Sequence, residues 1–163
     1  MTPEAQTTAK TNLKVSINEN IDGLYAIRQP LVPAVIWRRT PLPKFQTWID
    51  SLPDEELPSA RIALPLDKIY EVLAEVMKIS SMPACVQREM LIDDIAALAN
   101  VFAEINQTKF MRLRLEVINS NKCSKFHIDA VTTRLVCTYR GPGTQYCFST
   151  DEFDPSNIFD VPT

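Results

Sequence analysis

The side chains best suited to catalysis or metal binding lie in one stretch, CSKFHIDAVTTRLVCTYRGPGTQY, which covers residues 123–146. It contains His127, the only histidine in the chain, and Asp129 two residues later. Because successive side chains of a β-strand alternate between faces, these two share one face of a predicted strand at 125–129, with Cβ atoms about 7 Å apart. An imidazole nitrogen and a carboxylate oxygen on one face can bind the same metal ion. We therefore predict that His127 and Asp129 are metal ligands.

Two kinds of metal site are compatible with this pair. Non-haem iron(II) oxygenases use two histidines and one carboxylate on one side of the metal, and an HxD strand supplies the first two of these ligands. Alternatively, Cys123 precedes His127 by four residues, and Cys147 or Asp151 follows. Thiolate and imidazole ligands favour zinc, so Cys123 is a third candidate ligand. A histidine beside an aspartate also forms purely structural hydrogen-bonded pairs, and this alternative stays open.

The cysteines give no independent sign of a metal or redox site. None of the four forms a CxxC pair. In a predicted hairpin with a loop at 141–143, Cys137 would face Cys147, which fits a disulfide or a shared metal. With a longer loop the two would be only diagonal neighbours. In a cytosolic protein we expect reduced cysteines that pack in the interior.

Length and composition indicate a single globular domain. The chain has 163 residues, of which 45% are hydrophobic and 23% charged, and its net charge is −3. This balance gives no electrostatic reason to expect a nucleic-acid partner. No apolar run approaches the roughly 20 residues of a membrane helix, and the N-terminus lacks the apolar core of a signal peptide. We expect a cytoplasmic protein with neither a membrane nor a nucleic acid as partner.

The elements that must position the site begin after a predicted mobile arm, residues 1–22. A proline-rich segment, 23–65, follows and contains three short predicted elements. These are a strand at 34–39, a helix at 43–52 and a second strand at 59–64. We treat everything from residue 23 to residue 163 as one domain.

Two amphipathic helices are predicted next, at 66–80 and 83–106, because hydrophobic residues recur every three to four positions. Pro83 is suited to the first turn of the second helix. Asp93 and Asp94 lie on this helix and are predicted to form a solvated edge. We therefore predict that these helices form part of the hydrophobic core and that Asp93 and Asp94 are not a catalytic pair.

After Lys109 the period changes from helical to two. In FMRLRLEVIN the hydrophobic residues share one face, whereas Arg112, Arg114 and Glu116 share the other, as in a strand with one covered face. Segment 132–140 carries apolar residues on both faces and is predicted to be a central strand.

The glycine turn that follows segment 132–140 is predicted to return the chain antiparallel through 144–148. Helices therefore precede a mainly antiparallel sheet over 110–148, and an acidic tail, 149–163, ends the chain. This order predicts an α+β fold with the helices on one side of the sheet.

The order of elements around the HxD strand resembles the front half of the double-stranded β-helix, or jelly roll, of iron(II)- and 2-oxoglutarate-dependent oxygenases of the prolyl-hydroxylase type. This resemblance implies iron(II) and 2-oxoglutarate as cofactors. It makes Arg134 a candidate for binding a 2-oxoglutarate carboxylate or orienting Asp129, and Thr138 and Tyr139 candidates for hydroxyl groups lining the site. A plain salt bridge for Arg134 and a buried position for Tyr139 are the structural alternatives.

Longer stretches resemble a bacterial family catalogued as domain of unknown function 1826. They are KCSKFHIDAVTTRLVCTYRGPGTQY, AVIWRR near the start and MRLRLEVIN before the HxD strand. In that family the turn commonly reads GPGTEW, whereas Gln145 and Tyr146 stand here, which removes one acidic side chain. This resemblance covers most of the chain and implies no particular activity.

Half of an oxygenase site is missing from the sequence. The chain contains no second histidine, and no lysine or arginine follows Arg140. Three explanations fit: a longer protein with further strands and ligands beyond Thr163, a remnant kept as structure or as an interaction surface, or a different set of metal ligands. An oxygenase-like enzyme, a metal-handling protein and a structural or interaction module therefore all remain open, and so do the substrate and the oligomeric state.

Overall fold

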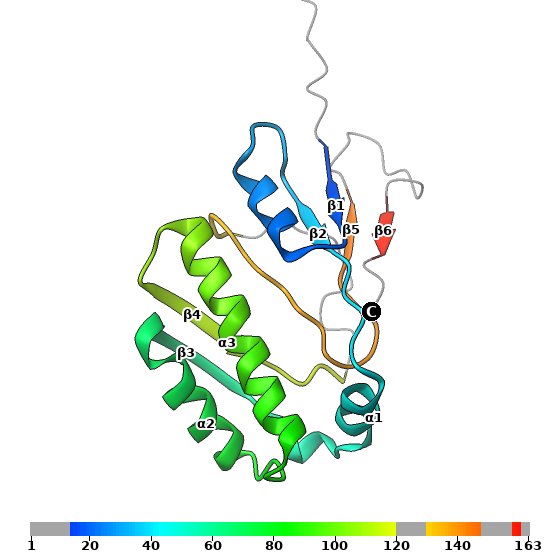
Figure 1. Cartoon of the computed structure of the whole chain (residues 1–163), viewed down its shortest axis with the longest axis vertical. Coiled ribbons are helices and arrows are strands. Elements are labelled where there is room, and N and C mark those ends of the chain that lie inside the picture. The colour runs from blue at the N-terminus through cyan, green and yellow to red at the C-terminus, as the bar shows by residue number, and fades with distance from the viewer. Residues whose placement is uncertain (1–13, 120–129, 148–157, 161–163) are drawn as a thin grey trace, which may run out of the picture. The chain divides into compact units, whose positions relative to one another are not determined.

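The computed structural model describes residues 14–119, 130–147 and 158–160, with the elements shown in Figure 1. The chain divides into two compact units, Met1–Arg39 and Thr40–Thr163. This division lies inside the proline-rich segment, residues 23–65.

The first unit contains a small parallel sheet. Strand β1 (Ser16–Asn18) pairs with β2 (Val35–Trp37), and the 3-10 helix η1 (Ile21–Arg28) connects them. The Arg39 guanidinium lies 4.8 Å from the ring centroid of Trp37, within the range of a cation–π contact. The predicted strand at 34–39 is confirmed. Strand β1 lies within residues 1–22, for which the sequence predicted a mobile arm. The three residues of β1 are too few to show a recognisable period.

The second unit combines helices and antiparallel strands. Its elements are α1 (Pro43–Ser51), η2 (Asp54–Glu56), β3 (Ala60–Pro65), η3 (Leu66–Lys68), α2 (Ile69–Ile79), α3 (Val86–Asn106), β4 (Phe110–Leu115), β5 (Gln145–Cys147) and β6 (Ile158–Asp160). The two helices predicted from periodicity and the short helix predicted at 43–52 are confirmed, and so are the strands that became β3 and β4. Helices and small sheets together confirm the α+β class.

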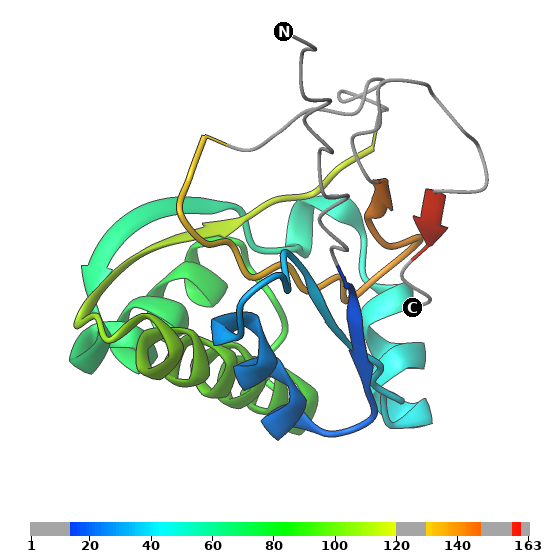
Figure 2. The same ribbon diagram turned by 90° about the horizontal axis from the view of Figure 1, so that it is seen from above.

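Strands β3 and β4 form an antiparallel ribbon whose two faces differ in character. The register places Ile62 opposite Leu113 and Leu64 opposite Met111. These residues pack against the hydrophobic core, and Figure 2 shows α2 and α3 on one side of the ribbon. The alternation predicted for β4 is therefore confirmed, since its odd-numbered residues are half-buried and its even-numbered residues are exposed.

The core of this unit forms where α2 and α3 cross the ribbon. Leu73 and Met77 of α2 are fully buried, and Leu91 of α3 is 2% exposed. Helix α1 adds Phe45 and Ile49 to the same cluster. Their spacing along each helix is three to four residues, which places them on one face. Hydrophobic burial thus accounts for the helices that the sequence predicted.

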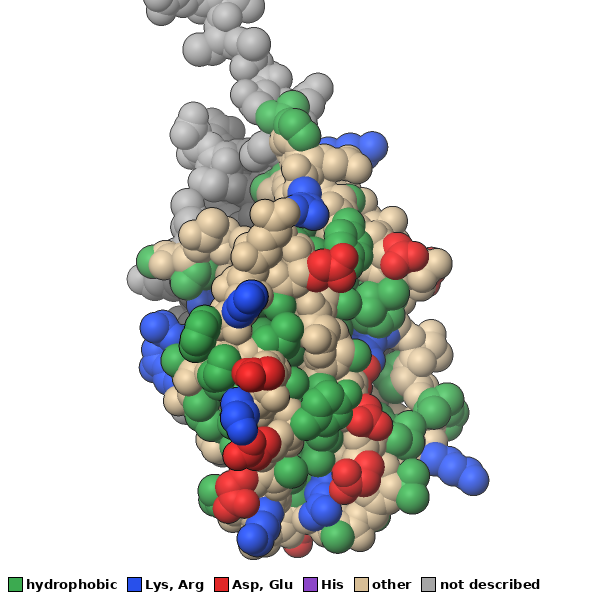
Figure 3. Space-filling model, turned by 60° about the vertical axis from the view of Figure 1, so that its left-hand side comes forward, with side chains coloured by type: hydrophobic (Ala, Val, Ile, Leu, Met, Phe, Trp, Pro, Cys, Tyr) green, Lys and Arg blue, Asp and Glu red, His purple; other side chains and the backbone are tan. Residues whose placement is uncertain are grey.

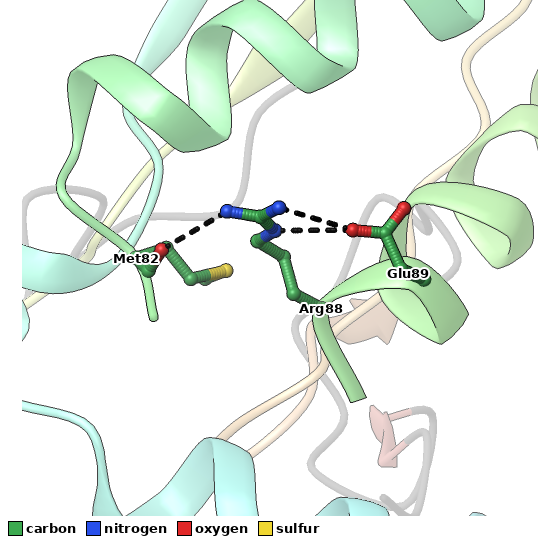
Figure 4. A network of polar contacts seen from close by, with 3 residues as sticks. All are labelled: Met82, Arg88 and Glu89. Carbon is green, nitrogen blue, oxygen red and sulfur yellow. Dashed lines mark hydrogen bonds and ion pairs between the residues drawn. The ribbon is translucent and has the colours of Figure 1, made fainter. Parts of the chain in front are cut away.

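The connection between α2 and α3 differs from the prediction. Ser81 has a φ of 58°, a left-handed conformation that redirects the chain after α2. Met82 is 3% exposed, and Arg88 Nη1 donates to its carbonyl oxygen over 3.4 Å while its other guanidinium nitrogens contact Glu89 (Figure 4). Met82 follows this turn and enters the core, so α3 begins only at Val86 and Pro83 is not in its first turn.

The predicted central strand at 132–140 is wrong. Residues 133–138 have no assigned strand, and β5 pairs with β6 rather than with this segment. Alternate residues of 133–140 are half-buried and exposed, so only one side is covered, and Val136 is 48% exposed. Apolar residues on both faces thus did not correspond to burial on both faces. The described residues form three two-stranded sheets in place of one larger sheet over 110–148.

A short turn fixes the start of β4. Gln107 ends α3 with a φ of 50°, and the Thr108 amide donates to the Ala103 carbonyl over 3.0 Å. One residue later, the Lys109 carbonyl accepts a hydrogen bond of 2.8 Å from the Leu66 amide, just after β3. The end of α3, the start of β4 and the end of β3 are therefore joined by backbone hydrogen bonds.

Charged and hydrophobic side chains are interspersed on the face of the molecule shown in Figure 3. In the described parts of the chain, no helix is both long enough and apolar enough to cross a membrane.

Candidate functional site

The three predicted metal ligands, Cys123, His127 and Asp129, lie outside the described residues, as does Asp151. Within the described ranges, no three histidine, cysteine or acidic side chains are grouped closely enough to hold a metal ion. The metal site therefore stays a prediction. Described segments flank the predicted ligands on both sides.

Upstream of the predicted ligands, β4 is held by its ladder with β3 and by side chains that reach the core. Its residues Met111, Leu113 and Leu115 pack on the hydrophobic cluster. Backbone pairing and burial together therefore hold this strand, which ends at Leu115, in place.

Downstream, Tyr139 ties the chain to two helices. Its hydroxyl donates to Asp94 Oδ2 of α3 over 2.6 Å, and its ring lies edge-on to Phe45 of α1 with centroids 6.3 Å apart. Its carbonyl accepts a hydrogen bond of 3.1 Å from Gln46 Nε2. The hydroxyl that was predicted to line a catalytic pocket is thus bonded to α3.

Asp94 departs from the solvated edge predicted for it. It is half-buried, whereas its neighbour Asp93 is exposed. The short bond to a tyrosine 45 residues away explains this position. Helical periodicity places Asp94 beside the core face, but nothing in the sequence pairs it with Tyr139, because the contact is long-range.

Arg140 adds a second attachment at the same end of the segment. Its Nη1 donates to the Leu52 carbonyl over 2.9 Å and lies 3.3 Å from Asp54 Oδ1. The carbonyl belongs to Leu52, the residue directly after α1, where backbone acceptors have no helical partner. The sequence reasoning assigned no role to this arginine.

Arg134 and Thr138 lie on the exposed side of the extended segment, and Tyr139 lies on its half-buried side. The three side chains predicted from the oxygenase resemblance are therefore divided between two sides. The structure brings Arg134 and Thr138 to the same side, and it directs Tyr139 to the helices. Their roles toward a cofactor stay predictions.

A cluster of arginines on the outer face of the β3–β4 ribbon was only partly foreseen. Arg112 and Arg114 were predicted to share a face of β4, and the register adds Arg61 of β3 directly opposite Arg114. We call Arg61, Arg112 and Arg114 the arginine face. The contribution of Arg61 depends on long-range strand pairing, which periodicity alone does not provide.

Comparison with known proteins identifies a family and no closer relative. No curated protein matches the chain, and no solved structure matches it. A family model described as protein of unknown function (DUF1826) matches residues 18–157. This match spans most of the chain and includes the HxD segment, β4 and the segment that carries Tyr139. The chain therefore belongs to the DUF1826 family of proteins of unknown function.

Proposed function

We propose that this protein binds a divalent metal ion through His127 and Asp129. The two residues stand at the spacing that places an imidazole and a carboxylate on one face of a strand. The observation that carries the proposal is that described residues on both sides of this segment pack against the same hydrophobic cluster. Strand β4 packs against the core that α3 helps to form, and Tyr139 bonds to Asp94 of α3. Fixed flanks reduce the conformational entropy lost when a metal orders the ligands between them.

More specifically, we propose a protein that resembles the iron(II)- and 2-oxoglutarate-dependent oxygenases and that is related to their jelly-roll fold. Imidazole and carboxylate donors suit iron(II). When bound, iron and 2-oxoglutarate would supply the oxidising chemistry. The residues of this chain would bind and orient, with Arg134 holding a carboxylate and Thr138 contributing a hydroxyl on the same exposed side.

A metal-handling protein without oxygenase chemistry is the second candidate. The bond from Tyr139 to Asp94 favours it, because it commits to the scaffold a hydroxyl that the oxygenase resemblance would place in a pocket. Cys123, four residues before His127, supplies a thiolate that suits zinc.

Metal analysis of His127→Ala and Asp129→Ala variants tests the shared proposal. We expect the wild-type protein to bind iron(II) or zinc stoichiometrically in a titration, and each variant to lose this binding. Asp93→Ala is the matched control, because Asp93 is an exposed acid on α3. Equal metal binding by the wild-type protein, both variants and the control would contradict the proposal.

The choice of metal separates the two candidates. Consumption of 2-oxoglutarate by the iron-loaded protein, abolished by His127→Ala, would support the oxygenase. Stoichiometric zinc in the purified protein, weakened by Cys123→Ser and with no 2-oxoglutarate consumption after iron loading, would support the metal-handling protein.

A further inference from the structure

The β3–β4 ribbon presents one face to the helices and carries its charges on the other. Ile62, Leu64 and the apolar residues of β4 contact the core. The outer face carries Arg61 and Ala63 of β3 with Arg112 and Arg114 of β4, all of them exposed. Three cations therefore lie on a ribbon that is six residues long in each strand.

The register brings these cations close together. Arg61 lies directly opposite Arg114, and Arg112 lies opposite Ala63. Opposed Cβ atoms in an antiparallel pair are about 5 Å apart, and diagonal neighbours such as Arg61 and Arg112 are about 7–8 Å apart. Like charges at such positions destabilise a sheet unless an anion compensates them.

One carboxylate already compensates part of this charge. Glu116 Oε2 lies 2.5 Å from Arg114 Nη2, and the Arg114 side chain is 54% exposed. Among the residues that the structure describes, no comparable ion pair forms with Arg61 or Arg112. The face thus binds a carboxylate at one arginine and has two further guanidinium groups available for two more negative charges.

Ala63, which neighbours both Arg61 and Arg112 on this face, leaves room for a ligand. Ala63 lies opposite Arg112 and two positions after Arg61, and its side chain is a single methyl group. Guanidinium groups bind carboxylates through paired parallel hydrogen bonds, which need a planar approach to both nitrogens. A small side chain at Ala63 permits that approach from above the ribbon.

We propose that the arginine face is a binding site for a short dicarboxylic acid, with one carboxylate at Arg61 and the other at Arg112. Arg114 remains paired with Glu116 and adds positive potential. Two negative charges match the two arginines, and a short spacer matches their diagonal separation. This inference does not depend on the proposed metal site, because it involves only residues of β3 and β4 and Glu116, which directly follows β4.

Binding of succinate to the full chain in the presence of a metal chelator tests this inference. We expect succinate to shift the Nε–Hε NMR signals of Arg61 and Arg112 and to release heat in calorimetry. Arg61→Gln and Arg112→Gln should each weaken succinate binding about tenfold or more, since each removes a charge-assisted pair. Lys78→Gln is the matched control, because it removes one exposed positive charge from α2. It should bind succinate as the wild-type protein does.

Three results would overturn the proposal. They are no perturbation by succinate, equal binding by both arginine variants and the control, and binding of inorganic phosphate or an acidic peptide without binding of succinate. Neutral succinamide checks that the carboxylates are recognised. The amide NMR spectrum checks that each variant is folded, and exposed positions of this kind usually change stability little. The chelator keeps this test separate from the metal proposal, since succinate binding can succeed or fail without any metal present.

Discussion

Strand β4 and segment 133–140 show the same alternation of half-buried and exposed residues, but they are held in different ways. Strand β4 has a hydrogen-bonded partner along its whole length and three apolar side chains on the core. Residues 133–138 form no strand, and at the end of the segment Tyr139 and Arg140 form hydrogen bonds with α1, α3 and the Leu52 carbonyl. The same sequence pattern is therefore compatible with a paired strand and with an extended segment in which no strand forms.

This difference separates two sources of stability. Around β4, burial of apolar area and a backbone ladder act together, so the loss of one group affects many contacts. Around Tyr139, a few side-chain hydrogen bonds to helices position the segment, so single substitutions should release it locally.

The largest loss of stability should come from Leu73→Ala in helix α2, which packs against the β3–β4 ribbon. Leu73 is fully buried, and the cavity left by this substitution should lower the free energy of unfolding by about 2–5 kcal/mol. Leu135→Ala is the matched substitution in segment 133–140, where Leu135 is half-buried, and it should cost about 1 kcal/mol. Urea denaturation measures both. Equal losses would show that the two regions are packed alike.

Tyr139→Phe should have an intermediate effect. The substitution keeps the ring beside Phe45 but removes the hydrogen bond to Asp94. A bond to a charged acceptor contributes about 1.5–3 kcal/mol, and the half-buried position of both groups indicates the lower end of this range. Hydrogen exchange should accelerate in 133–140 and remain unchanged in α2.

Two further variants sharpen the Tyr139 measurement. Tyr70→Phe removes the hydroxyl of an exposed tyrosine on α2 and should leave stability unchanged. In a double-mutant cycle, Tyr139→Phe combined with Asp94→Asn should cost less than the sum of the single changes. Strict additivity would mean that the Tyr139–Asp94 bond does not hold the segment.

Arg140→Gln should have the smallest effect of the three. Its bond to the Leu52 carbonyl is only partly buried, and the Arg140 side chain is 36% exposed. Partly exposed ion pairs and their hydrogen bonds contribute about 0.5–1 kcal/mol. Thermal denaturation beside Lys78→Gln measures the difference. A loss as large as that of Leu73→Ala would make Arg140, and not the helical core, the main support of this part of the chain.

Local periodicity predicted the elements of the second unit well. The positions of α2, α3 and β4 follow from apolar residues at intervals of three to four or of two, because burial on one face produces these intervals. Helix α3 began later than predicted, since Met82 is drawn into the core first.

Long-range pairing could not be predicted in the same way. Segment 132–140 has the composition of a central strand, and its apolar residues on both faces suggested two covered faces. Pairing also needs a neighbour in register, and β5 instead pairs with residues 158–160. The bond from Tyr139 to Asp94 and the position of Arg61 opposite Arg114 likewise join residues far apart in sequence. The candidate metal ligands were found from the spacing of His127 and Asp129 and from the order of elements around them, and they stay a prediction.

The short turn at Gln107–Lys109 limits how this protein can change length during evolution. Its backbone bonds set the register of β4 against β3, and side chains alternate along β4 with a period of two. An insertion or deletion of one residue in the first half of β4 would exchange the two faces beyond it, placing Arg112 and Arg114 in the core and Leu113 in water. We therefore expect related chains to tolerate changes here in steps of two residues, and to place single-residue changes outside the β3–β4 ribbon.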